Sequence, residues 1–152
     1  MHDLPLIGWR EWLSLPALGL PAIKAKVDSG ARTSALHVAV LEEFQRDGVT
    51  WLRFAVDSGR RNCAAVLCEA PACDRRAVTD SGGNTAERWF IRTMIGLAGR
   101  AFPAEINLTN RRNMLFPMLL GRSALSDRFR IDPARSYVCG RPRRRVRPAE
   151  AL

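Results

Sequence analysis

Short segments in which apolar and polar residues alternate, separated by turn residues, make up most of this chain and constrain its fold more than any other feature. Gly, Pro, Asp and Asn recur about every eight to twelve residues, and no long stretch repeats with the period of a helix. This pattern predicts an all-β domain, built as a barrel or a sandwich. The segments expected to be strands are 6–15, a strand ending at 28, 50–56, 63–68, 75–79, 87–95, 101–108, 116–120 and 130–138.

Turn residues predict which of these segments pair as hairpins. Asp47-Gly48 predicts a tight hairpin before 50–56, and a second hairpin is expected across 58–62, with Pro71 ending that pair. Residues 80–85 are expected to form the glycine-rich tip of a third hairpin, and 97–100 a further tight turn before the return strand 101–108. Two alternatives stay open for 33–40, a strand or a brief helical turn. Residues 123–129 are expected to form one or two helical turns with Ser123 as a candidate cap.

The stretch 23–33 has an unusual strand ending, because apolar residues alternating with two lysines lead directly into Asp28-Ser29-Gly30. An aspartate is unfavourable in a strand and costly to bury, so it is either a turn residue bonded to its own backbone or an acid kept for chemistry. Two further Asp-Ser-Gly triplets begin at Asp57 and Asp80. Their flanking residues are typical of solvated hairpin tips, so only the Asp28 copy is expected to lie in the interior.

Length and charge add further limits. The chain has 152 residues and a formal net charge of +9, which fits one domain with its own core and acidic partners such as nucleic acid or carboxylate-rich protein. Residues 141–152, rich in Arg and Pro, are expected to be a disordered tail. The sequence starts without a leader pattern and contains no run long enough to span a membrane, so a cytoplasmic protein without membrane contact is expected.

Four cysteines, Cys63, Cys68, Cys73 and Cys139, lack a Cys-x-x-Cys pair. The first three are spaced by five, which places neighbours on opposite faces of a strand and predicts buried reduced thiols rather than a metal cluster. The sequence also lacks a His-Glu-x-x-His motif and a glycine-rich phosphate loop followed by lysine. Neither a metal site, nor an ATP site, nor any other cofactor is expected.

A two-part motif carries the resemblance to a known family. Asp28-Ser29-Gly30-Ala31 is followed about ninety residues later by Leu119-Leu120-Gly121-Arg122, with a glycine-tipped hairpin between them. This combination resembles the retropepsins, the half-sized aspartic peptidases that work as homodimers. The runs 7–11, 21–37 and 118–122 look more closely like the bacterial retropepsin-like family labelled ATP-dependent zinc protease, whose members occur beside ATP-grasp glutamate ligases. The resemblance covers residues 6–140, and it implies a closed barrel with residues 1–140 forming one peptidase domain.

The resemblance also implies roles for particular residues. In aspartic peptidases two carboxylates share one proton, so that one acts as a base on water and the other as an acid on the scissile carbonyl. This chain offers one interior Asp-Ser-Gly, so a homodimer is expected to supply the second acid. The implied sets are Asp28, Ser29 and Gly30 for catalysis; Ala31, Leu119, Leu120 and Gly121 for support of the catalytic turn; Ser81, Gly82, Gly83 and Asn84 for a flap; and Arg32 and Thr33 for substrate binding.

One position departs from the viral retropepsins, which carry an acid where this chain has Arg32. Arg122 cannot pair with that residue and is expected to pair with Glu11 or Asp132. If Arg32 faces the cleft, it would bind a substrate carboxylate. A branch of the family is associated with trimming glutamate tails from a ribosomal protein, so the expected substrate is a peptide or protein rich in glutamate. Two alternatives remain: a retropepsin-shaped binding module without proteolysis, and a ribosome or nucleic-acid contact through the arginine tail.

Overall fold

The computed structural model describes residues 3–110 and 115–142, and it confirms the expected all-β class. The expected arginine tail lies almost entirely outside the described residues, at 143–152. The elements are β1 (Leu6–Leu15), the 3-10 turn η1 (Pro16–Leu18), β2 (Leu20–Asp28), β3 (Ser34–His37), β4 (Ala39–Arg46), β5 (Val49–Val56), β6 (Val66–Thr79), β7 (Thr85–Leu97), β8 (Arg100–Thr109), β9 (Met118–Gly121), α1 (Arg122–Leu125) and β10 (Arg130–Ser136).

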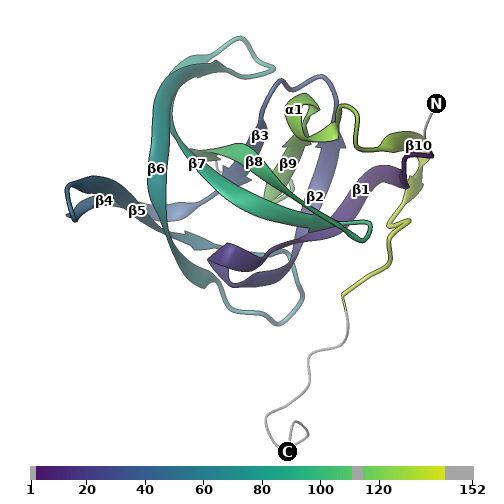
Figure 1. Ribbon diagram of the computed structural model, residues 1–152, viewed down its shortest axis with the longest axis horizontal. Helices are drawn as coiled ribbons and strands as arrows, with labels where there is room; N and C mark the ends of the chain where they lie inside the picture. The colour runs from purple at the N-terminus through teal and green to yellow at the C-terminus, as the bar shows by residue number, and fades with distance from the viewer. Residues whose placement is uncertain (1–2, 111–114, 143–152) are drawn as a thin grey trace, which may run out of the picture.

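The described strands form one sheet in the order β10-β1-β2-β9-β3-β8-β7-β6-β5-β4 (Figure 1). The sheet curls back on itself, because a bridge between Ser14 and Gly96 also joins β1 to β7. A Cβ at Gly96 would overlap the Ser14 hydroxyl oxygen, so glycine at this position lets the Ser14 side chain keep its orientation where the two strands meet. The hairpin of β4 and β5 extends away from this curled part, to the left in Figure 1.

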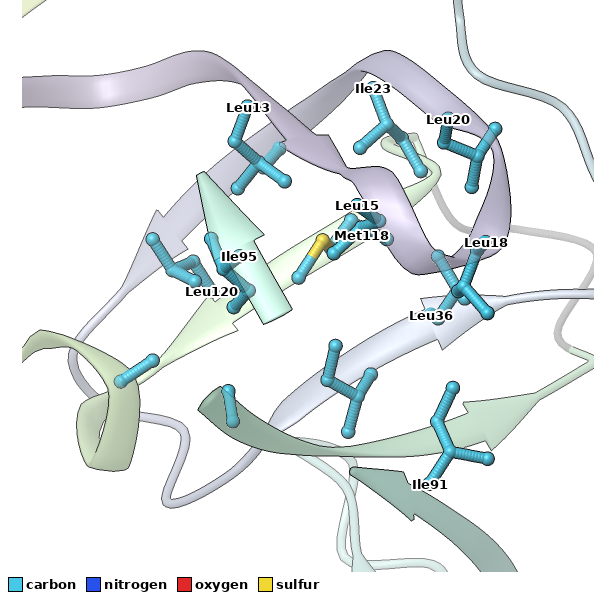
Figure 2. Packing of buried hydrophobic residues seen from close by; sticks show 14 of the residues in the cluster. Leu13, Leu15, Leu18, Leu20, Ile23, Leu36, Ile91, Ile95, Met118 and Leu120 are labelled. Carbon is cyan, nitrogen blue, oxygen red and sulfur yellow. The ribbon is translucent and has the colours of Figure 1, made fainter. Parts of the chain in front are cut away.

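Alternating apolar side chains from the curled strands fill its interior. Figure 2 shows Leu and Ile side chains from β1, η1, β2, β3 and β7 meeting Met118 and Leu120 of β9. Both β9 residues have no exposed surface, and burial of one such side chain contributes about 1.5–3 kcal/mol to stability. The core therefore anchors β2 and β9 side by side, which fixes the ends of both strands.

The hairpins at Asp47-Gly48, at residues 80–85 and at 97–100 are confirmed, and residues 34–37 are a strand rather than a helical turn. The expectation that Pro71 ends a strand is wrong, because β6 runs through it. Residues 66–71 of β6 pair with β5, and 72–79 pair with β7. The proline thus sits where the strand changes partners, and its missing N–H interrupts neither ladder in the middle.

Two smaller expectations are corrected. Ser123 is not a cap: it lies inside α1, whose N-cap is Gly121 and has no side-chain hydrogen bond. The four cysteines are free thiols as expected, but only Cys68 is buried, whereas Cys73 and Cys139 are exposed. Burial raises the pKa of the Cys68 thiol to about 11, so this side chain stays protonated near neutral pH and acts as a small apolar group.

Candidate active site

Asp28 is the last residue of β2, and the parallel pairing of β2 with β9 sets it opposite Gly121. β9 lies between β2 and β3, running parallel to the first and antiparallel to the second. The two halves of the expected motif, far apart in sequence, are therefore adjacent in the sheet. Leu120 is fully buried beside Val27, and Leu119 is half-buried beside Lys26.

A local turn orients the Asp28 carboxylate. The backbone N–H of Gly30 donates a hydrogen bond of 3.0 Å to Asp28 Oδ1, and the N–H of Ala31 donates one of 3.2 Å to the Asp28 carbonyl. Oδ2 accepts no hydrogen bond from the residues that the structure describes. One carboxylate oxygen is thus fixed by the turn, and the other is available to water or to a second acid.

The strand-to-helix connection after β9 holds the rest of this turn. The N–H of Arg122 donates to the Ala31 carbonyl at 2.7 Å, and the N–H of Ser123 donates to the Arg32 carbonyl at 3.1 Å. Gly121 donates its N–H to the buried Ser34 hydroxyl at 3.0 Å. A Cβ on Gly121 would overlap the Thr33 carbonyl group, so only glycine allows this close approach.

Asn107 is a site residue that the sequence reasoning missed. It is 1% exposed on β8, and its Nδ2 donates to the Ser34 carbonyl at 2.9 Å and to Thr33 Oγ1 at 3.3 Å. Arg88 of β7 donates to Asn107 Oδ1 at 3.0 Å. The turn after Asp28 is therefore tied to the strand that leads from the glycine-rich hairpin tip. An amide between Ile106 and Leu108 in an apolar strand was the available signal, since buried amides need partners.

The expected flap residues, Ser81, Gly82, Gly83 and Asn84, lie at the exposed tip between β6 and β7. Asp80 organises this tip, because its Oδ1 accepts hydrogen bonds from Gly82 at 2.9 Å and Asn84 at 3.0 Å. In Figure 1 the tip and the connection between β2 and β3 both lie at the upper end of the molecule.

The expectation that Asp28 lies in the interior is wrong for the single chain. Asp28 is half-buried, and Ser29 and Gly30 are exposed. The Asp57 copy is not a simple solvated tip either, because Ser58 is only 5% exposed and its carbonyl accepts a hydrogen bond of 2.9 Å from the Lys24 N–H. A turn motif alone does not reveal what packs against it, which is why the expectation failed.

The expected partners of Arg122 are also wrong. The buried Glu11 carboxylate instead accepts backbone hydrogen bonds from Gly8, Val138 and Cys139, at 2.7, 2.9 and 3.1 Å. Asp132 accepts one from the N–H of Ala134 at 2.9 Å. No ion pair within the described residues includes Arg122 or the exposed Arg32. Thr33 is half-buried, with its hydroxyl engaged by Asn107.

In the described ranges, no three His, Cys, Asp or Glu side chains gather as they would around a metal ion. No helix in those ranges has the length and apolar character needed to cross a bilayer.

Comparisons with known proteins match nearly the whole chain. Residues 6–142 fit a family model described as RimB-like, retropepsin-like aspartic endopeptidase RimB. Similar curated proteins are each named probable alpha-L-glutamate ligase: one from Shewanella pealeana is 43% identical and one from Desulfotalea psychrophila is 46% identical, both over 136 residues. These matches cover 89% of this chain but only 30% and 29% of the ligases, so the chain spans less than a third of their length.

A solved structure is also similar. A Legionella pneumophila protein of unknown function has a TM-score of 0.74 and 26% sequence identity to this chain. The match covers 90% of this chain and 98% of that protein.

Proposed function

Starting from the fact that this chain belongs to the RimB-like family of retropepsin-like aspartic endopeptidases, we propose that it is one subunit of a homodimeric aspartic peptidase. The observation that carries the proposal is the position of Asp28, at the end of β2 and opposite Gly121 of β9, with one carboxylate oxygen held by the turn. The other oxygen is available to share a proton with a second carboxylate.

The chemistry requires a second acid close to the first. Two carboxylates a few ångströms apart cannot both ionise, so one stays protonated while the other takes a proton from the attacking water. In this proposal a two-fold axis brings Asp28 of the partner subunit to that position. The exposure of Ser29 and Gly30 in the single chain supports a contact between the two subunits at this turn. We also propose that the curled sheet of each subunit is a closed barrel.

The proposed substrate is an acidic polypeptide, such as a glutamate-rich tail of a ribosomal protein, cut in the cytoplasm. Support comes from the glutamate ligases that contain a segment similar to this chain. It also comes from Arg32, exposed beside the Asp28 turn and without an ion pair among the described residues. A guanidinium can hold a substrate carboxylate through two parallel hydrogen bonds.

The test uses purified full chain and two peptides that differ only in a terminal run of glutamates or glutamines. Cleavage of the glutamate peptide by the wild-type chain, and its loss in Asp28→Asn, is the expected result. Sedimentation of both proteins at the assay concentration checks that the dimer survives the substitution. Undiminished cleavage by the variant, or cleavage by a protein that sediments only as a monomer, would overturn the proposal.

A further inference from the structure

A second surface, which is not part of the candidate active site, combines cations with aromatic rings. We define this cationic aromatic face by Trp9, Arg10, Lys24, Phe116, Tyr137 and Arg141. It lies on the side of β1 and β2 that faces away from the core, since Leu13, Ile23 and Ala25 of these strands point inward and are buried.

The cations of this face lie against the rings. The Arg10 guanidinium lies 4.6 Å from the Trp9 ring and 4.8 Å from the Tyr137 ring. Lys24 Nζ lies 5.6 Å from the Phe116 ring, and Arg141 lies 4.4 Å from Tyr137. Such contacts hold the side chains in place, but they leave their charges unneutralised.

The rings form two contacting pairs, and the Arg10 and Lys24 side chains each contact a ring of both pairs. Trp9 meets Phe116 edge to face with centroids 6.0 Å apart, and Trp12 stacks on Tyr137 with centroids 6.3 Å apart and planes 27° from parallel. A hollow of about 360 Å³ adjoins this end of the face and is lined in part by Trp12, Arg100 and Arg141. Flat rings, a hollow and fixed cations are thus present together.

Within residues 3–110 and 115–142, these charges take part in no ion pair with a carboxylate. The only ion pairs within the described residues lie elsewhere, and none includes Arg10, Lys24 or Arg141. The buried carboxylate of Glu11 on β1 accepts hydrogen bonds from three backbone N–H groups. Lys26, opposite Arg10 across the β1–β2 ladder, is exposed and adds a further positive charge.

The hairpin of β4 and β5 also places arginines against aromatic rings, but there the arginines are paired with an acid. Arg46 lies 4.3 Å from the Trp51 ring, and Arg53 lies 4.6 Å from the Phe44 ring. Both arginines, however, pair with the Glu69 carboxylate, at 3.0 and 2.8 Å. Among the described residues, the cationic aromatic face has no acid in an equivalent position, so its positive charges are available to an anion from another molecule.

We propose that this face binds single-stranded RNA, with phosphates on the cations and unstacked bases on the rings. A second copy of the chain would oppose like charges across a two-fold axis, which disfavours self-association there. An acidic polypeptide would satisfy the cations but would make no use of the rings, whereas every nucleobase stacks on an aromatic side chain. Unpaired loops and ends are the form in which RNA offers its bases to proteins, while DNA is mostly duplex. This inference is independent of the proposed peptidase activity.

The experiment measures fluorescence anisotropy of a labelled twelve-nucleotide oligouridine with the full chain at two salt concentrations. Arg10→Gln with Lys24→Gln is expected to weaken binding about tenfold or more and to reduce the salt dependence by about 1.4 in the log–log slope, at 0.7 for each lost contact. The control, Arg46→Gln with Arg75→Gln, removes the same charge from cations already paired with Glu69 and Glu87. It is expected to bind within about twofold of wild type.

A second pair of variants tests the rings. Tyr137→Leu is expected to weaken RNA binding several-fold, because it removes a ring that contributes to base stacking and that holds Arg10 and Arg141 in place. Trp51→Leu on the β4–β5 hairpin should leave binding unchanged. Circular dichroism and sedimentation check that each variant keeps its fold and mass.

Four outcomes would overturn the inference. They are no RNA binding by the wild-type chain, equal weakening by both charge pairs, tighter binding of the matching DNA oligomer, and displacement of RNA by polyglutamate with no effect of Tyr137→Leu. A change in sedimenting mass caused only by the Arg10 and Lys24 substitutions would instead assign the face to contacts between copies.

Discussion

The three Asp-Ser-Gly turns of this chain share one local hydrogen bond and have very different surroundings. In each, the aspartate Oδ1 accepts a hydrogen bond from the glycine two residues on, at 3.0 Å for Asp28, 3.0 Å for Asp57 and 2.9 Å for Asp80. This is the turn that a short carboxylate forms with its own backbone. The turn itself therefore does not distinguish a catalytic aspartate from a structural one.

The segments packed against each turn make the difference. The Asp28 turn receives two backbone hydrogen bonds from residues 122 and 123, and Gly121 contacts its far end. The Asp57 turn follows an antiparallel strand and packs its serine under β2. The Asp80 turn closes an exposed hairpin. An identical tripeptide is thus a candidate catalytic loop, a turn with a buried serine that bonds to β2, or an exposed hairpin tip, according to the segments that pack against it.

The largest expected effect is on catalysis. Asp28→Asn removes the acid that we propose shares a proton, and peptide cleavage should fall by at least about 10²–10⁴-fold, the range for loss of a general acid or base. Asp57→Asn and Asp80→Asn keep an oxygen that can accept the glycine N–H, so their cleavage rates should stay within about twofold of wild type. Steady-state kinetics on the three variants compare the three turns directly. Equal losses in all three would mean that the turns are equivalent.

The next effect is on stability. Gly121→Ala places a Cβ on the Thr33 carbonyl, and the resulting backbone shift should lower the free energy of unfolding by about 1–3 kcal/mol or more. Gly82→Ala is the matched change at the Asp80 turn, where the nearest atom is the Asp80 side-chain oxygen at 3.3 Å. Its cost should stay below about 1 kcal/mol, because a flexible side chain can move. Urea unfolding of the two variants measures both values.

Asn107 gives a third contrast. Asn107→Ala leaves the buried Ser34 carbonyl without its amide partner, and loss of a buried hydrogen bond of this kind should cost about 1–3 kcal/mol. Asn84→Ala at the Asp80 turn removes an exposed side chain while the backbone N–H still bonds to Asp80. That variant should unfold within about 0.5 kcal/mol of wild type. A small effect at Asn107 would show that the amide does not anchor the Asp28 turn.

The smallest effect concerns one hydroxyl. Ser34→Ala removes the acceptor for the Gly121 N–H, and the unfolding free energy should fall by about 1 kcal/mol. Ser81→Ala, at the exposed tip, should change it by less than about 0.5 kcal/mol. Thermal unfolding monitored by circular dichroism compares the two, with the Ser34 variant expected to melt about 2–4 °C lower. An unchanged melting temperature would indicate that water replaces the hydroxyl.

Much of the fold could be read from the sequence because its signals are local. Asp47-Gly48, Gly82 and Gly99 mark hairpins whose pairing involves only neighbouring segments. The apolar run ending at Asp28 also predicts its strand and turn. Pro71 misled the interpretation because a strand that changes partners at that residue tolerates a missing N–H, and only the neighbouring strands reveal such a change.

By itself, the sequence determined the turns, the alternation and the residues able to act as an acid, since these depend on a few adjacent side chains. Only the tertiary structure decided what surrounds them. It placed Ser34 against Gly121, 87 residues away, and Asn107 against Ser34, 73 residues away. It also gathered Trp9, Lys24 and Tyr137 on one face. Such contacts depend on how the whole sheet buries its apolar side chains, because strand order follows from the shared core and not from any single segment.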